Sequence, residues 1–142
     1  MRVSLLYALL LGGAAIICFL SWLPNPRIST YGFFSQEIGH WVDADAHVNN
    51  RTAIPFLAMG LFSGVWLVFT KQPLQQWIGV CLGFMGIVLV AEMGQLHLPN
   101  RHFDWGDIAW GTAGGLGGMV VGAVFASLLA LFRQLPPRLK SS

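Results

Sequence analysis

The chain has 142 residues, which is enough for one small domain and leaves no room for a second. Hydrophobic residues make up 55% of it and charged residues only 10%, and the mean hydropathy is +0.63, a balance that excludes an ordinary soluble domain. The net charge is +2 and the basic residues form no stripe that would neutralise phosphates, so we expect no nucleic-acid partner.

Four apolar runs are long enough to cross the hydrocarbon core of a bilayer as helices, which takes about 17–25 residues. They cover about 3–23, 53–70, 77–95 and 108–132. The first run follows a basic residue, Arg2, but it is too long for the core of a signal peptide, so we expect it to be retained. The sequence therefore predicts a single all-α membrane domain over 1–142, a four-transmembrane-helix bundle in contact with the lipid bilayer.

The segment between the first two runs, 24–52, is too long for a simple turn. Its stretch YGFFSQEIGHWV predicts an amphipathic helical segment, because four large apolar residues recur at three- and four-residue spacing. These residues are Tyr31, Phe34, Ile38 and Trp41. The segment either lies in the membrane interface or covers the polar stretch 92–107. In the second case it would bring toward that stretch the polar residues Glu37, His40, Asp43 or His47.

Basic residues near the ends of the runs predict the orientation, because cytoplasmic loops of membrane proteins carry more Lys and Arg. With both termini inside, five of the 8 Lys and Arg residues lie on the cytoplasmic side and the other three lie outside. The inner residues are Arg2, Lys71, Arg133, Arg138 and Lys140, and the outer ones are Arg27, Arg51 and Arg101. We therefore expect both termini in the cytoplasm and the polar stretch 92–107 on the outer face.

That stretch, EMGQLHLPNRHFDWGD, gathers ionisable groups at the outer end of the third run. Glu92 and Gln95 are three residues apart and share one helix face. A carboxylate in a span costs about 2.5–3.5 kcal/mol at the bilayer centre and less near the end, so we expect Glu92 to face the bundle and to pair with Arg101. Asp104 and Asp107 precede the fourth run, where either residue would cap the free N–H groups of the helix.

Two interpretations of the polar stretch stay open. As a functional site, it would bind the polar head of a ligand through Glu92, Gln95, Arg101, Asp104 and Asp107. As a structural staple, Asp107 would cap the fourth helix and Arg101 would pair with Glu92 or Asp104. We favour the functional site, because one loop holds more polar groups than two helix ends require.

The sequence identifies no catalytic residue and no cofactor. The spacings of His97, His102 and the aspartates match no zinc pattern, so we predict no metal site. The outer Ser and Thr residues lie in no nucleophile elbow. General acid–base chemistry by Glu92 with Asp104 or His102 stays open, so enzymatic activity is undecided.

Glycines at four-residue spacing predict close packing between helices, which is how membrane helices associate where lipid supplies no hydrophobic drive. They are Gly60 and Gly64 in the second run, Gly79 and Gly83 in the third, and Gly111, Gly114, Gly115, Gly118 and Gly122 in the fourth. We expect contacts inside the bundle rather than a homodimer seam.

Several of these motifs together resemble the VanZ-like family of small bacterial membrane proteins. The resemblance rests on the order Glu92-xx-Gln95, LPNR ending in Arg101, Asp104-xx-Asp107, DIAWGTAGGLGG and, earlier, NNRTAIPFLAMG, and it covers about 49–122. The family pattern places Asn four residues after the second Asp, where this chain has Gly111. The resemblance implies a bacterial cytoplasmic (inner) membrane location and a cell-envelope context linked to glycopeptide resistance or exopolysaccharide.

We expect a binding or accessory role at the envelope. A binding protein would hold the polar head of a lipid-linked or glycopeptide ligand. An accessory subunit of a larger membrane complex would instead contact other membrane subunits through its glycine and aromatic faces. A membrane enzyme would use the carboxylates of Glu92, Asp104 and Asp107.

Overall fold

A computed structural model describes residues 2–25, 27–33, 35–44, 48–99 and 102–134. Over these ranges all regular elements are helical, which confirms the prediction of an all-α protein. In chain order they are α1 (Arg2–Ser21), the short 3₁₀ helix η1 (Ile28–Tyr31), α2 (Gln36–Asp43), α3 (Val48–Phe69), α4 (Leu74–Gln95) and α5 (Trp105–Gln134).

Within the described ranges, three helices are long and apolar enough to cross a membrane. They are Thr52–Phe69 of α3, Leu74–Gln95 of α4 and Trp105–Arg133 of α5. Helix α1 is apolar over the shorter range Leu6–Ser21, so its role as a fourth span stays a prediction. Length and composition thus indicate a membrane protein.

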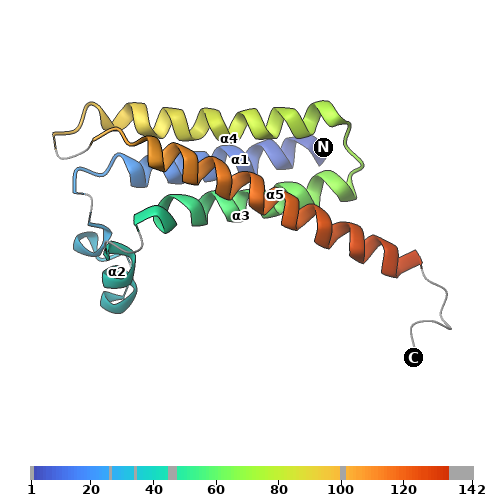
Figure 1. The fold of residues 1–142 in the computed structure, drawn as a ribbon, viewed down its shortest axis with the longest axis horizontal. Coiled ribbons are helices and arrows are strands. Elements are labelled where there is room, and N and C mark those ends of the chain that lie inside the picture. Colours follow the sequence, from blue (N-terminus) through green and yellow to red (C-terminus); the bar gives the residue numbers. More distant parts are fainter. Residues whose placement is uncertain (1, 26, 34, 45–47, 100–101, 135–142) are drawn as a thin grey trace.

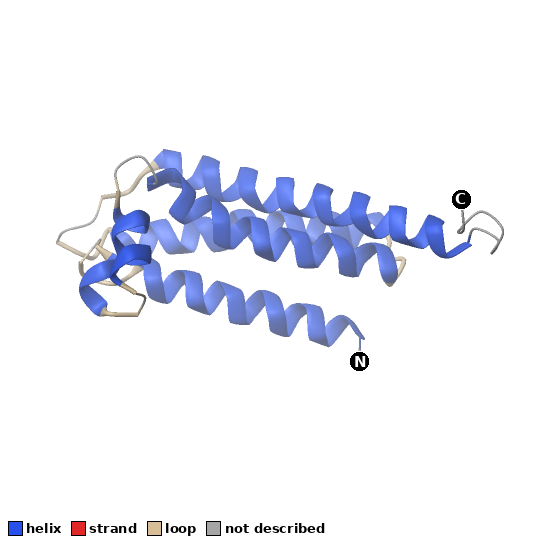
Figure 2. Ribbon diagram, turned by 90° about the horizontal axis from the view of Figure 1, so that it is seen from below, coloured by secondary structure: helices blue, strands red, loops and turns tan. Residues whose placement is uncertain are grey.

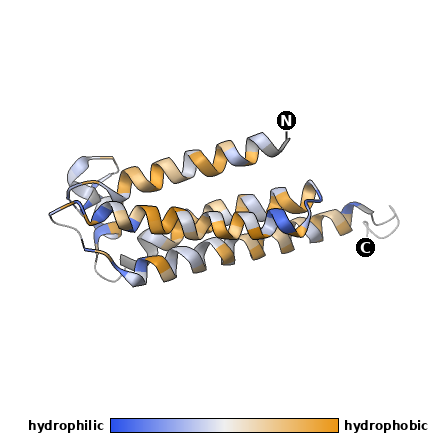
Figure 3. Ribbon diagram, turned by 90° about the horizontal axis from the view of Figure 1, so that it is seen from above, coloured by the Kyte–Doolittle hydropathy of each residue, from blue (hydrophilic) through white to orange (hydrophobic). Residues whose placement is uncertain are grey.

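Helices α1, α3, α4 and α5 run side by side (Figure 1). The start of α1, the α3–α4 turn and the end of α5 lie at one end of the molecule, and α2 and the α4–α5 loop lie at the other (Figures 1 and 2). Figure 3 shows hydrophobic residues along most of the long helices and hydrophilic residues gathered near their ends. This separation suits helices whose middle parts contact lipid.

Helices α3 and α5 approach until their backbones touch. A Cβ atom at Gly60 would collide with the carbonyl oxygen of Gly115, and one at Gly118 would collide with that of Leu57. The same holds for Gly64, Gly114 and Gly122, which face backbone atoms of Met119, Ala53 and Leu61. Only residues without a side chain permit this approach, which gains van der Waals contact along the whole seam.

Two of the glycines expected at helix contacts lie elsewhere. A Cβ atom at Gly79 or Gly83 would meet nothing within 4 Å. Both residues line a hollow of about 260 Å³ between α4 and α1, where Tyr7 and Ala14 form part of the opposite wall. The expectation of tight packing at these two positions is therefore wrong, because α1 does not approach α4 as closely as α5 approaches α3.

The core lies where α4 packs against the α3–α5 pair. Phe56 and Phe84 are fully buried and meet edge to face, with ring centroids 6.3 Å apart and planes at 88°. The Phe84 ring fits over Gly115, where a Cβ atom would lie 2.8 Å from the ring. From α1, Leu6 is the buried residue that joins this core.

A tight turn joins α3 to α4. Gln72 N–H donates to the Leu67 carbonyl at 3.0 Å and Lys71 N–H donates to the Val68 carbonyl at 3.1 Å, which is the Schellman pattern at a helix end. Lys71 adopts the left-handed conformation, with φ 52°. The apolar helices thus reverse direction within a few residues and keep Lys71 exposed at this end.

The segment 24–52 does not contain the single amphipathic helix that its spacing predicts. The 3₁₀ helix ends at Gly32, whose φ of 68° breaks the helix, and α2 begins only at Gln36. Ile38 and Trp41 still share one exposed face of α2, whereas Tyr31 stacks on Phe33 with ring centroids 5.7 Å apart. Phe34 lies outside the described residues.

Candidate functional site

A polar pocket of about 100 Å³ lies between the helices at the α2 end of the molecule. Four helices contribute polar side chains to its wall: Ser21 from α1, Thr52 from α3, Glu92 and Gln95 from α4, and Asp107 from α5. Its remaining lining is apolar and includes Ile17, Pro55 and Val88. Three of the five predicted ligand-binding residues thus come together in one pocket.

Glu92 is 2% exposed, and both of its carboxylate oxygens accept hydrogen bonds. Oε1 accepts from Gln95 Nε2 at 2.8 Å, and Oε2 accepts from the backbone N–H of Asp104 at 3.0 Å. The second bond joins the end of α4 to the residue that precedes α5. Glu92 therefore fastens the α4–α5 loop across the wall of the pocket.

Gln95 is 5% exposed and links α4 to α1. Its Nε2 donates to Glu92 Oε1 and to Ser21 Oγ, both at 2.8 Å. A carboxylate oxygen can only accept, so this contact fixes which end of the amide is nitrogen. The amide oxygen, Oε1, accepts no hydrogen bond from the described residues, which leaves a buried acceptor in the pocket wall.

The two aspartates have different partners. Asp104 precedes the first residue of α5, and its Oδ1 accepts from the backbone N–H of Gly106 at 2.7 Å, so Asp104 is the residue that caps this helix. Asp107 lies in the first turn and its Oδ1 accepts from Thr52 Oγ1 at 2.8 Å. Its Oδ2 accepts no hydrogen bond from the described residues and is a second open acceptor beside the pocket.

Ser21 and Thr52 are pocket residues that are absent from the site predicted from the sequence. Both are hydroxyl residues at the ends of apolar runs that flank the segment 24–52, and that position is the signal that would have found them. Trp22 also supports the pocket wall, since its Nε1 donates to the Ala91 carbonyl at 3.0 Å. The indole reaches this carbonyl because Gly94 has no side chain to block it.

Other predicted partners are not at the pocket or are not described. Arg101 and His47 lie outside the described residues, so the proposed Glu92–Arg101 pair stays a prediction. Asp43 accepts from the Ser29 N–H at 2.9 Å and so ties α2 to η1, and no described α2 residue lines the pocket. Among the described residues, no three His, Cys, Asp or Glu side chains are grouped to hold a metal ion.

Gly111 lies beneath the pocket at a close contact of three helices. A Cβ atom there would be 2.9 Å from Val88 Cγ2 on α4 and 3.2 Å from Thr52 Cγ2 on α3. The position where the VanZ-like pattern has Asn therefore has no space for an amide unless these side chains move.

Comparisons of the chain with protein families, with curated proteins and with solved structures found no match.

Proposed function

We propose that this protein binds, at the outer face of a bacterial cytoplasmic membrane, an amphiphilic molecule whose head donates hydrogen bonds. The observation that carries the proposal is the pair of open acceptors at the pocket, Gln95 Oε1 and Asp107 Oδ2. A buried acceptor without a donor costs about 1–3 kcal/mol, and a hydroxyl or ammonium head would recover that cost. The pocket of about 100 Å³ suits a small polyol or amine head.

In this proposal α1 crosses the membrane as a fourth span and both termini are cytoplasmic. The pocket then opens at the outer end, away from Lys71 and Arg133, which lie at the opposite end of the helices (Figure 1). The resemblance of 49–122 to VanZ-like proteins supports an envelope setting, such as glycopeptide resistance or exopolysaccharide handling. The ligand in such a setting is a lipid-linked molecule.

The contacts favour binding over acid–base catalysis. Both oxygens of Glu92 accept hydrogen bonds that hold the α4–α5 loop, so this carboxylate acts on the structure of the pocket. Gln95 has no titratable group and supplies an acceptor only. The pocket therefore offers acceptors to a ligand that donates hydrogen bonds, and these contacts require no proton transfer.

Equilibrium binding of radiolabelled 1-O-octylglycerol to the protein in lipid nanodiscs tests the proposal. The two hydroxyl groups of this probe match the two open acceptors. We expect Gln95→Ala to weaken binding about five-fold and Asp107→Asn about ten-fold, the losses that follow from one neutral and one charge-assisted hydrogen bond. Asp107→Asn keeps an oxygen for Thr52, so the variant should unfold at the wild-type temperature.

Two controls separate recognition from general effects. Gln75→Ala makes the same change as Gln95→Ala at an exposed position at the other end of α4 and should leave binding unchanged. The dimethyl ether of the probe has no hydrogen-bond donor and should not compete. Equal binding of the diol and its dimethyl ether, or wild-type affinity in both pocket variants, would refute the proposed function.

A further inference from the structure

Residues of α1 and α3 line both the polar pocket and a second hollow in the described part of the chain. The second hollow is a groove of about 450 Å³ nearer the opposite end of these helices, lined from α1 by residues such as Leu6 and Leu9 and from α3 by residues such as Phe62 and Phe69. Its one hydroxyl residue, Ser63, donates to the Met59 carbonyl at 2.7 Å, and apart from the indole N–H of Trp66 the groove is lined by hydrocarbon and the thioether of Met59. Figures 2 and 3 show α1 standing apart from the other long helices toward its N-terminus, where this groove lies.

The groove continues the pocket along the same two helices. On α3 the pocket lining ends at Phe56 and the groove lining begins at Ala58. On α1 the pocket lining reaches Ile17 and the groove lining begins at Leu10. A ligand that extends from the pocket along α1 and α3 would therefore reach the groove after it passes Met59 and Gly13.

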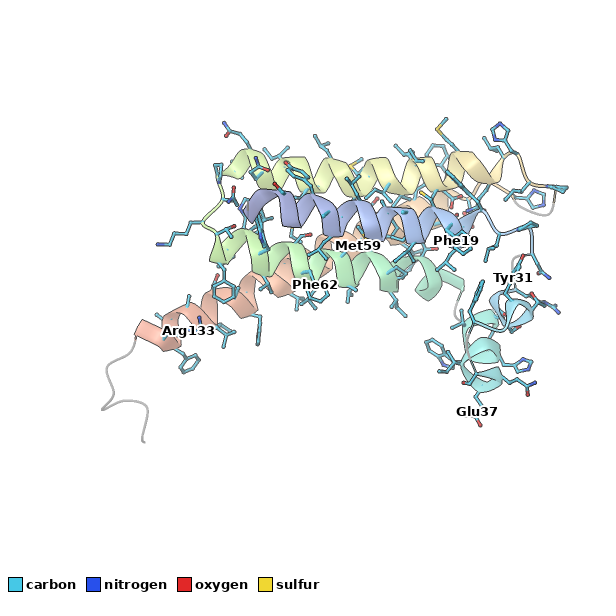
Figure 4. All side chains as sticks on the ribbon, turned by 180° about the vertical axis from the view of Figure 1, so that it is seen from behind. Phe19, Tyr31, Glu37, Met59, Phe62 and Arg133 are labelled. Atoms are coloured by element: carbon cyan, nitrogen blue, oxygen red, sulfur yellow. The ribbon has the colours of Figure 1, made fainter. Side chains whose placement is uncertain are left out.

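A flexible side chain, that of Met59, lies between α1 and α3 at the pocket end of the groove. Met59 projects from α3 toward α1, and its sulfur would lie 2.7 Å from a Cβ atom at Gly13 (Figure 4). Methionine is unbranched and turns about three side-chain bonds, so it adapts to a neighbour at low cost. Gly13 leaves the space in which the thioether lies and in which a hydrocarbon chain would pass.

We propose that the molecule held by its head in the polar pocket carries a long hydrocarbon tail, and that the tail lies in the α1–α3 groove beyond Met59. This inference rests on the proposed function. From Thr52 at the pocket to Phe69 at the far end of the groove is 69 − 52 = 17 residues, or about 26 Å at the helical rise of 1.5 Å per residue. One leaflet of hydrocarbon is only about 15 Å deep. The tail therefore passes the bilayer midplane, which selects long single chains over short ones.

Photo-cross-linking in nanodiscs tests where the tail lies. The probes are 1-O-octylglycerol and 1-O-hexadecylglycerol, each with a diazirine on the terminal carbon, and labelled peptides are mapped by mass spectrometry. We expect the hexadecyl probe to label Leu6–Leu10 and Phe62–Phe69, and the octyl probe to label the region of Gly13 and Met59. Gln95→Ala should lower both labels about five-fold, because the head holds the tail in place.

Filling the groove should block the long tail alone. Ala58→Phe places a ring at the entrance of the groove, whereas Ala15→Phe places the same ring on an exposed part of α1 that lines neither hollow. We expect Ala58→Phe to abolish labelling of Phe62–Phe69 by the hexadecyl probe and to spare the octyl probe, with Ala15→Phe like wild type. Leu9→Trp fills the groove from α1 and gives the same test if Ala58→Phe does not fold.

The two proposals fail differently. The tail site is refuted if the hexadecyl probe labels the exposed faces of α4 and α5, or if both groove variants leave its labelling unchanged. The proposed function still stands in that case if binding of the octyl probe depends on Gln95. If neither probe binds in a way that depends on Gln95, both proposals are wrong.

Discussion

Glu92 and Gln95 share one face of α4 but have different roles in the pocket. Glu92 uses both oxygens to join the end of α4 to the start of α5. Gln95 uses both amide hydrogens, on Glu92 and on Ser21, and keeps its oxygen for the pocket. The structural staple, which the sequence leaves as one of two alternatives, is thus present at Glu92, and under the proposed function Gln95 beside it contacts the ligand.

Replacement of Glu92 should therefore act on stability first. Glu92→Ala removes the acceptor of two hydrogen bonds and leaves the Gln95 amide and the Asp104 N–H short of a partner, so we expect the free energy of unfolding to fall by about 2–3 kcal/mol. Denaturation of the protein in nanodiscs measures the change. Glu37→Ala, at an exposed position of α2, is the matched control and should have no effect. Wild-type stability together with lost binding in Glu92→Ala would instead make Glu92 a ligand contact.

The sequence predicts one side of the pocket better than the other. Glu92, Gln95 and Asp107 are close together in the chain, and a group of polar residues beside apolar runs is a pattern that indicates a site. Ser21 and Thr52 meet Gln95 and Asp107 across separations of 74 and 55 residues, which no local pattern encodes. Hydropathy also does not predict which aspartate caps α5. The helix begins at Trp105, before its apolar run, so the capping residue is Asp104 and not Asp107.

The pairing of α3 with α5 shows what glycine spacing predicts at the scale of a helix. Spacing marks a face that can approach another backbone, and Gly60, Gly64 and Gly118 do so. The same spacing at Gly79 and Gly83 leads to no close approach, because spacing cannot specify which helix lies opposite. In the segment 24–52, the helical period runs through Gly32, whose left-handed conformation divides the predicted helix.

Adjacent glycines of α5 allow a matched test of this seam. Gly118→Ala would drive a methyl group into the Leu57 carbonyl, so we expect a loss of about 1–3 kcal/mol or more as the helices separate. Gly117→Ala adds the same methyl group where nothing lies within 4 Å, and should be neutral or stabilising by up to about 1 kcal/mol through helix propensity. Thermal denaturation of both variants measures the difference. Equal effects at the two positions would contradict the α3–α5 packing.

At the scale of the whole molecule, the two ends of the helices differ in chemistry. One end carries the open acceptors of the pocket, buried at Gln95 and half-buried at Asp107, and the exposed aromatic residues Trp41 and Trp105. The other carries Lys71 and Arg133, and the Arg133 guanidinium lies 5.7 Å from the centre of the Phe69 ring. Lys71 and Arg133 at one end, against Arg27 among the described residues at the other, fit the excess of basic residues that the proposed orientation requires on the cytoplasmic side. The remaining tail residues counted for that orientation, Arg138 and Lys140, lie outside the described residues.

Single-cysteine labelling of cells tests both the orientation and the fourth span, after Cys18 and Cys81 are changed to alanine. Three exposed positions report on the two ends: His97→Cys beside the pocket, Gln75→Cys at the start of α4 and Ser4→Cys near the start of α1. We expect a membrane-impermeant maleimide to label position 97 in cells whose outer membrane is opened, and positions 75 and 4 only in inverted vesicles. Ser4 is decisive for α1, because a helix that failed to cross would leave position 4 on the same side as position 97. Labelling of position 75 from outside would reverse the orientation and place the pocket at the cytoplasmic face, where its ligand would have to be a cytoplasmic-leaflet lipid.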